Sequence, residues 1–153
     1  MDPAALQSGL GIAGAVMALG LSALGSALGT GAAGSAAVGA WKKCYAQGKQ
    51  APFLLLSFVG APLTQTLYGM ILMFQMRGRA LAGAPGLPLC LIGVFAGIGI
   101  GASALMQGRC AAAAADSQAE TGKGFTNYMA AVGIIETVAI FTMVFAFLCI
   151  GKV

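Results

Sequence analysis

The sequence predicts an all-α membrane protein in which four transmembrane helices form two tandem hairpins. The first observation is composition: the 153 residues are 59% apolar and 8% charged, with a mean hydropathy of +0.90, whereas soluble domains carry about 25% charged residues. The second is that the charges cluster between long uncharged segments, and the third is an internal repeat. This composition excludes a soluble enzyme, a disordered tail and, because only eight scattered Lys and Arg carry the net charge of +4, a nucleic-acid-binding surface.

The charged residues divide the chain into four segments that are each long enough to cross a membrane. About 20 apolar residues suffice for one helical span. The first segment could hold two short spans, but no charge or turn divides it, so we expect one helix and not a signal peptide. The first hairpin then covers residues 1–79 and the second covers residues 80–153. The four segments lack charges except for Glu136: 3–41, 50–76, 80–108 and 124–151.

Loop charges favour one orientation of the hairpins. Four spans place both termini on one side of the membrane and the first and third loops on the other. Basic residues favour the cytoplasmic side. We therefore expect these two loops in the cytoplasm and both termini on the non-cytoplasmic side of the cell membrane. Five of the eight basic residues belong to the first and third loops: Lys42, Lys43, Lys49, Arg109 and Lys123.

Two motifs recur between the hairpins at nearly the same offset. Ser26-Ala-Leu-Gly-Thr-Gly31 matches Ser103-Ala-Leu-Met-Gln-Gly108 at an offset of 77 residues. Leu63-Thr-Gln-Thr66 aligns with Ile134-Ile-Glu-Thr137 at an offset of 71 residues. The two offsets differ by the extra length expected for the first loop. A duplicated helical hairpin explains both matches.

The first and third helices are rich in glycine, whereas the second and fourth carry most of the phenylalanines. Glycines four residues apart allow close approach of membrane helices. One interpretation is packing within a single monomeric bundle; the other is a closed ring with the small-residue helices on its inner circle. For the ring we expect packing at Gly25, Gly29, Gly97 and Gly101.

Glu136 lies near the centre of the fourth segment, between Lys123 and Lys152. An ionisable side chain at this depth is costly unless it is partnered, and it marks an ion or proton site by default. The alternative is a permanently protonated glutamate that makes one structural hydrogen bond.

Polar side chains in the second and third segments fall at the same depth as Glu136. If the second hairpin turns at Thr121-Gly122, Gln107 is level with Glu136, and Gln65 is central in the second segment beside Thr64. Tyr68 shares a helix face with Gln65, and Pro62 removes a helical hydrogen bond nearby. These residues offer carboxylate, amide and hydroxyl oxygens, which suit a hard cation.

With these motifs the chain resembles the duplicated four-helix proteolipid, the K or c subunit, of V-type and A-type rotary ATPases. The resemblance runs along the whole chain and combines the glycine-rich odd helices with three motifs. They are Pro62-Leu-Thr-Gln-Thr-Leu-Tyr-Gly69, Gln107-Gly-Arg109 and Glu136-Thr137.

The resemblance implies a rotor ring of identical subunits in the lipid bilayer, in which Glu136 carries Na⁺ past a stator subunit that holds a fixed cation. It also implies a central-stalk subunit at the cytoplasmic loops and no catalysis by this chain itself, since no phosphate-binding loop motif occurs. Tyr68 would bond the glutamate. The resemblance assigns the cation to Glu136, Thr64, Gln65, Gln107 and the carbonyl of Ala61.

Two other interpretations remain at this point. The same ring could carry H⁺ instead of Na⁺, because a proton needs only the carboxylate and one hydrogen-bond partner. A small four-helix multidrug exchanger also uses one membrane glutamate, but in its first helix among aromatic residues, unlike Glu136. A purely structural proteolipid would not need Glu136. No organic cofactor is expected.

Overall fold

The computed structural model describes residues 2–153, and this part of the chain folds into four long antiparallel spans, as the sequence predicts. The first span is one uninterrupted helix. The second is divided by short 3-10 turns at Phe53–Leu55 and Ala61–Leu63. The helices are α1 (Pro3–Ala46), α2 (Leu56–Gly60), α3 (Thr64–Leu81), α4 (Gly86–Thr121) and α5 (Phe125–Ile150).

The ends of the helices follow from their local sequence. The Asp2 side chain accepts a hydrogen bond from the backbone N–H of Ala4 at 3.2 Å, which caps the start of α1. Helix α4 ends at Thr121 because Gly122 takes a left-handed conformation with φ of 66°. The third loop is thus shorter than the first, residues 47–52, as the repeat offsets predict.

Helix α3 extends slightly beyond the hairpin boundary expected from the charges. It continues to Leu81, and the turn to α4 comprises residues 82–85. The boundary between residues 79 and 80 therefore falls in the last turn of α3, because Arg77 and Arg79 mark the end of the apolar segment and not the end of the helix.

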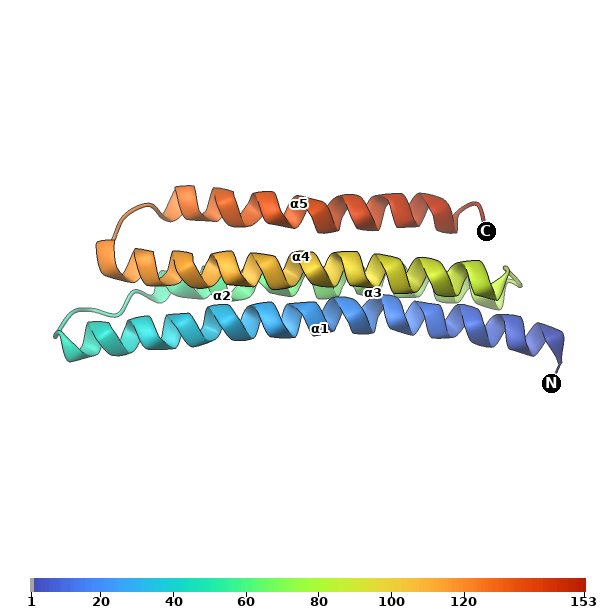
Figure 1. Cartoon of the computed structure of the whole chain (residues 1–153), viewed down its shortest axis with the longest axis horizontal. Helices are drawn as coiled ribbons and strands as arrows, with labels where there is room; N and C mark the ends of the chain where they lie inside the picture. Colours follow the sequence, from blue (N-terminus) through green and yellow to red (C-terminus); the bar gives the residue numbers. More distant parts are fainter. Residues whose placement is uncertain (1) are drawn as a thin grey trace.

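Helix α4 lies between α1 and α5, and α2 and α3 pack behind them (Figure 1). Both termini lie at the same end of the bundle, opposite the first and third loops (Figure 1). At the loop end, the Lys43 ammonium and the Asp116 carboxylate form a 3.0 Å ion pair that joins the ends of α1 and α4.

The contact between α1 and α4 depends on glycine. A Cβ atom on Gly25 would collide with the backbone of Gly101, and a Cβ on Gly29 would collide with the carbonyl of Ala104. Gly97 likewise faces the backbone of α1. The four glycines expected at ring contacts thus lie between α1 and α4 of one chain. This is packing within a single bundle, the first of the two interpretations of these glycines.

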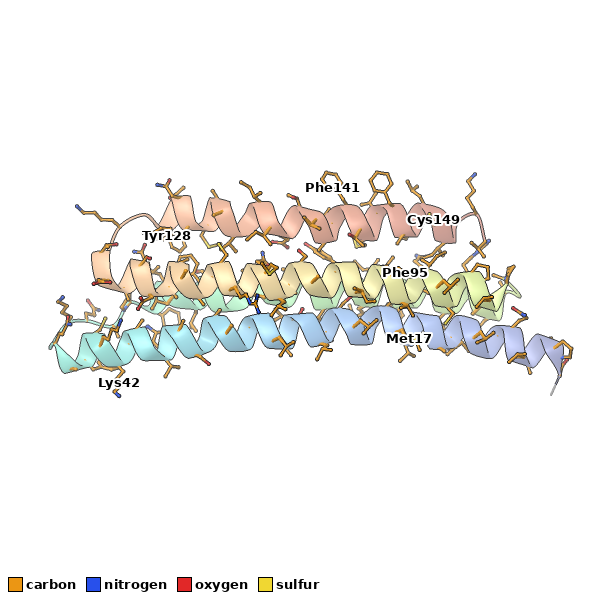
Figure 2. All side chains as sticks on the ribbon, in the orientation of Figure 1. Met17, Lys42, Phe95, Tyr128, Phe141 and Cys149 are labelled. Atoms are coloured by element: carbon orange, nitrogen blue, oxygen red, sulfur yellow. The ribbon has the colours of Figure 1, made fainter. Side chains whose placement is uncertain are left out.

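The outer surface of the bundle is apolar. Phe141 and Phe145 of α5 are 61% and 62% exposed, and Phe141 points away from the other helices (Figure 2). All four spans are long and apolar enough to cross a membrane. The chain is therefore a multi-pass membrane protein whose exposed side chains are suited to lipid.

Candidate functional site

The six residues expected at the ion site lie together where α3, α4 and α5 meet. The 3-10 turn Ala61–Leu63 places the start of α3 against α5. Pro62 has no N–H to continue the helical hydrogen bonds of α2, so the chain tightens into this turn. The turn brings the Ala61 carbonyl and the Thr64 side chain to the same point.

Glu136 of α5 accepts hydrogen bonds from three side chains on two other helices. Its Oε1 accepts from the Thr64 hydroxyl at 2.7 Å and from the Tyr68 hydroxyl at 2.6 Å. Its Oε2 accepts from Nε2 of Gln107 at 3.2 Å. Buried polar groups need such partners, and the carboxylate is therefore held in one position between α3 and α4.

Three acceptor oxygens surround the Thr64 hydroxyl, which has only one hydrogen to donate. They are Oε1 of Glu136 at 2.7 Å, the carbonyl oxygen of Ala61 at 3.1 Å and Oε1 of Gln65 at 3.2 Å. One hydrogen can satisfy one of these oxygens at a time. Three acceptor oxygens thus compete for one hydroxyl hydrogen beside the turn at Pro62, and of these only Oε1 of Glu136 has a second donor, Tyr68.

Two fully buried glutamines lie behind these oxygens. Nε2 of Gln65 donates to Oε1 of Gln107 at 2.7 Å, and Nε2 of Gln107 donates to the Val132 carbonyl at 3.1 Å as well as to Glu136. Both glutamines are 0% exposed. Gln107 therefore faces Glu136 with its amino group, whereas the resemblance leads one to expect its carbonyl oxygen.

The site is closed on one side and open on the other. Gln65 and Gln107 are buried, but Glu136, Thr64 and Tyr68 are half-buried and border the outer surface of the bundle.

Sequence reasoning missed two contacts that hold α5 against α4. The Val132 carbonyl accepts from Gln107, and the Ser103 hydroxyl donates to the Ile135 carbonyl at 2.9 Å. Backbone carbonyls carry no sequence signal. Ser103 is part of the repeat and could have been singled out by its match to Ser26.

In residues 2–153, no group of three His, Cys, Asp or Glu side chains is placed to hold a metal ion. The candidate site instead has one carboxylate among neutral oxygens. Neutral oxygens and carboxylates are ligands for hard cations.

Fold and site together define a class of protein: a four-span membrane proteolipid with one carboxylate near the middle of its last helix. Residues 84–149 match the family model of the ATP synthase C subunit, and the match includes Gln107 and Glu136. No curated protein matches the chain. The matched part covers most of the second hairpin and is similar to the C subunit of ATP synthases, in agreement with the resemblance to rotor proteolipids.

The matched family has several general properties. Its members are non-catalytic subunits of rotary ATPases that assemble into rings of identical copies and work against a stator subunit. The second hairpin is thus similar to a non-catalytic, ion-transporting membrane proteolipid.

Proposed function

We propose that this chain is the rotor-ring subunit of a V-type rotary ATPase and that each copy carries one Na⁺ at Glu136. The cation ligands are Glu136, the Thr64 hydroxyl, the amide oxygens of Gln65 and Gln107, and the Ala61 carbonyl. Tyr68 holds the carboxylate in place. The duplicated hairpin has Gln65 where the second hairpin has Glu136, so one four-helix copy moves one ion.

The observation that supports Na⁺ most directly is the excess of acceptor oxygens around Thr64. Oxygens of Ala61, Gln65 and Glu136 lie within 3.2 Å of the Thr64 oxygen and share its one hydrogen. A bound cation would satisfy all of them at once. A half-turn of the Gln107 amide would add a fifth oxygen, because its Oε1 and Nε2 exchange places.

A proton would use the site differently. A protonated Glu136 needs one acceptor for its hydrogen, and it leaves the oxygens of Ala61 and Gln65 without a use. The proton-carrying ring is the alternative, and carbodiimide labelling of Glu136 separates the two.

The carriage of the ion follows from the cost of charge in lipid. A bare carboxylate in the bilayer costs several kcal/mol, so Glu136 must be neutralised by its ion before the ring turns through lipid. A fixed cation on the stator subunit would compete with Na⁺ for the carboxylate and release it. Loading, rotation and release then couple ion flow to the turning of the ring.

The remaining partners are assigned to the two ends of the bundle. A central-stalk subunit binds the first and third loops on the cytoplasmic side, and the termini lie on the other side. The ion pair between Lys43 and Asp116 supports one joint surface, because it ties the two loop regions together.

The test is labelling of Glu136 by a hydrophobic carbodiimide, which reacts with the protonated carboxyl group. In purified rings above neutral pH, Na⁺ should slow the labelling in a concentration-dependent manner, with half-protection in the millimolar range or below, on the order of the weaker hard-cation sites. K⁺ at the same ionic strength is the control.

The protection should weaken as the pH falls, because H⁺ and Na⁺ compete for one carboxylate. If Na⁺ protects no better than K⁺ at any pH above neutrality, the sodium assignment is wrong and the proton-carrying ring is the better account.

A further inference from the structure

We infer that Ser103 of α4 is a positioning residue for Glu136, because its hydroxyl holds the backbone of α5 in register while the carboxylate changes its partners. Ser103 acts through the peptide group that precedes Glu136 and does not touch the ion. The inference rests on the proposed role of Glu136 as the ion carrier, but not on whether the ion is Na⁺ or H⁺.

Helix α5, which carries Glu136, is the least buried of the four spans. Of its 26 residues, only Val132, Ala139 and Ile150 are buried. Lipid is as apolar as the helix surface, so the association of membrane helices depends on close packing and on hydrogen bonds between them. With so few buried side chains, α5 depends strongly on its hydrogen bonds for the position of Glu136.

Two side chains of α4, one helical turn apart, donate hydrogen bonds to the backbone of α5. The Ser103 hydroxyl donates to the Ile135 carbonyl at 2.9 Å, and Nε2 of Gln107 donates to the Val132 carbonyl at 3.1 Å. The two helices run antiparallel (Figure 1), so both bonds specify the same alignment of α4 with α5. A slip of one turn would break both bonds and displace Glu136 by about 5.4 Å.

The bond from Ser103 is not the one that a hydroxyl inside a helix commonly makes. Serine and threonine in helices often bond back to a carbonyl of the preceding turn of their own helix. Ser103, which is 5% exposed, instead bonds across to α5. Four other hydroxyls of this chain do bond back to the preceding turn: Ser22, Thr121, Thr137 and Thr142.

The internal repeat supplies a counterpart of Ser103 that lacks this bond. Ser26 of α1 corresponds to Ser103 at the offset of 77 residues, and it is also buried, with 2% exposure. It lines a hollow of about 540 Å³ beside α1, and within residues 2–153 its hydroxyl has no hydrogen-bond partner. The same serine therefore pins a helix backbone only in the hairpin that carries Glu136.

The Ser103 bond differs from the bonds to the carboxylate because neither of its groups titrates or holds the ion. The bonds from Thr64, Tyr68 and Gln107 end on the carboxylate itself, so they rearrange whenever it gains or loses an ion. The bond from Ser103 ends on the backbone one residue before Glu136. It therefore keeps α5 in place while the carboxylate is empty, and the ligands stay assembled for the next ion.

Ser103→Ala in purified rings tests this role, with Ser26→Ala as the matched control. The two measurements are the rate at which a hydrophobic carbodiimide labels Glu136 without Na⁺ and the Na⁺ concentration for half-protection. We expect both to rise about threefold in Ser103→Ala, the effect of losing one hydrogen bond between membrane helices. Ser26→Ala removes an equally buried hydroxyl that makes no bond, so both values should stay at the wild-type level.

Ser103→Thr keeps the hydroxyl and should return both values to those of the wild type, which the loss of a purely space-filling role would not explain. Equal values for Ser103→Ala and Ser26→Ala, or a change that Ser103→Thr does not reverse, would overturn the inference. If Na⁺ protects none of the rings, including the wild type, the sodium assignment fails instead. The labelling rates without Na⁺ then still decide the role of Ser103.

Discussion

Thr64 has an unusual position in the site because its single hydroxyl proton is shared by a carboxylate, an amide and a backbone carbonyl. The Pro62 turn brings the Ala61 carbonyl to this hydroxyl at 3.1 Å, while α5 supplies Glu136 at 2.7 Å. A Na⁺ bound here would contact these three acceptor oxygens in place of the shared hydrogen. The hydroxyl oxygen of Thr64 would then be a further ligand of the ion.

The first prediction concerns this hydroxyl. Thr64→Val keeps the shape of the side chain but removes its oxygen, and losing one polar partner in a buried site costs about 1–3 kcal/mol. We expect the Na⁺ concentration for half-protection of Glu136 against carbodiimide to rise by about tenfold or more.

Thr66→Val is the matched control, since Thr66 lies on the same helix but lines the hollow beside α1 and not the ion site. Equal shifts for the two variants would show that the Thr64 hydroxyl is no cation ligand.

The second prediction concerns Glu136 itself. Glu136→Gln keeps the volume and can still accept the hydrogen bonds from Thr64 and Tyr68, so the ring should assemble normally on a native gel. It cannot neutralise a cation, so ATP-driven ion transport into vesicles should fall to background.

Glu120→Gln makes the same change at an exposed position near the third loop and should leave transport intact. Transport at the wild-type level in Glu136→Gln would show that Glu136 does not carry the ion.

At this scale the sequence predicted which side chains meet but not how they bond. Counting residues from the turn at Thr121 placed Gln107 level with Glu136, and their 3.2 Å contact agrees. The orientation of the Gln107 amide could not be predicted, because it is fixed by the Val132 carbonyl and by Gln65. Those contacts exist only once three helices have packed.

At the scale of the elements, the glycine contact between α1 and α4 supports the rest of the bundle. The two backbones approach so closely at Gly25 and Gly101 that neither position has room for a Cβ. The spans behind them, α2 and α3, pack against both α1 and α4 (Figure 1). Loss of this contact should therefore loosen the whole chain.

The third prediction follows from this contact. Gly29→Leu places a side chain against the Ala104 carbonyl and Pro62, and overpacking costs about 1–3 kcal/mol or more. We expect a lower midpoint of thermal unfolding for the detergent-solubilised monomer, measured by circular dichroism, together with poor ring assembly.

Gly39→Leu, where a Cβ meets nothing within 4 Å, introduces the same side chain into the same helix and should leave the midpoint unchanged or raise it. If Gly29→Leu unfolds at the wild-type temperature, the tight contact at Gly29 is not present in the protein.

The sequence predicted the number of spans well because a long apolar segment without charges is rarely anything but a membrane span. The interruption near Pro62 followed equally from its missing N–H. Which glycines face which neighbour could not be predicted, since a membrane helix is apolar on every side and no amphipathic pattern marks its inner face. Gly25 and Gly31 look alike in sequence, yet one is buried in the chain and the other is exposed.

At the scale of the whole molecule, the bundle is longer than a membrane is thick. Helix α1 has 44 residues, or roughly 66 Å at 1.5 Å per residue, against about 30 Å of hydrocarbon. The ion pair of Lys43 with Asp116 lies at the far end of α1 and α4 from both termini. The loop end of the bundle therefore extends into water, where a partner subunit can reach it.

The fourth prediction is the orientation of this long bundle. Both termini lie at one end and the first and third loops at the other (Figure 1). The loop end carries Lys42, Lys43, Lys49 and Lys123, four of the eight basic residues, whereas Arg109, expected in the third loop, lies inside α4 close to the level of Gln107. An excess of Lys and Arg favours the cytoplasmic side. We expect Gln50→Cys, in the first loop, to react with a membrane-impermeant maleimide only in inside-out vesicles.

Ala82→Cys, in the turn between α3 and α4, should react only in right-side-out vesicles. Both positions are exposed and uncharged, so neither substitution alters the loop charges that set the orientation, and the unsubstituted chain gives the background from its native cysteines. The reversed pattern would place the basic loops outside. The central-stalk subunit would then have to bind the end that carries the termini, where Arg77, Arg79 and Lys152 supply positive charge.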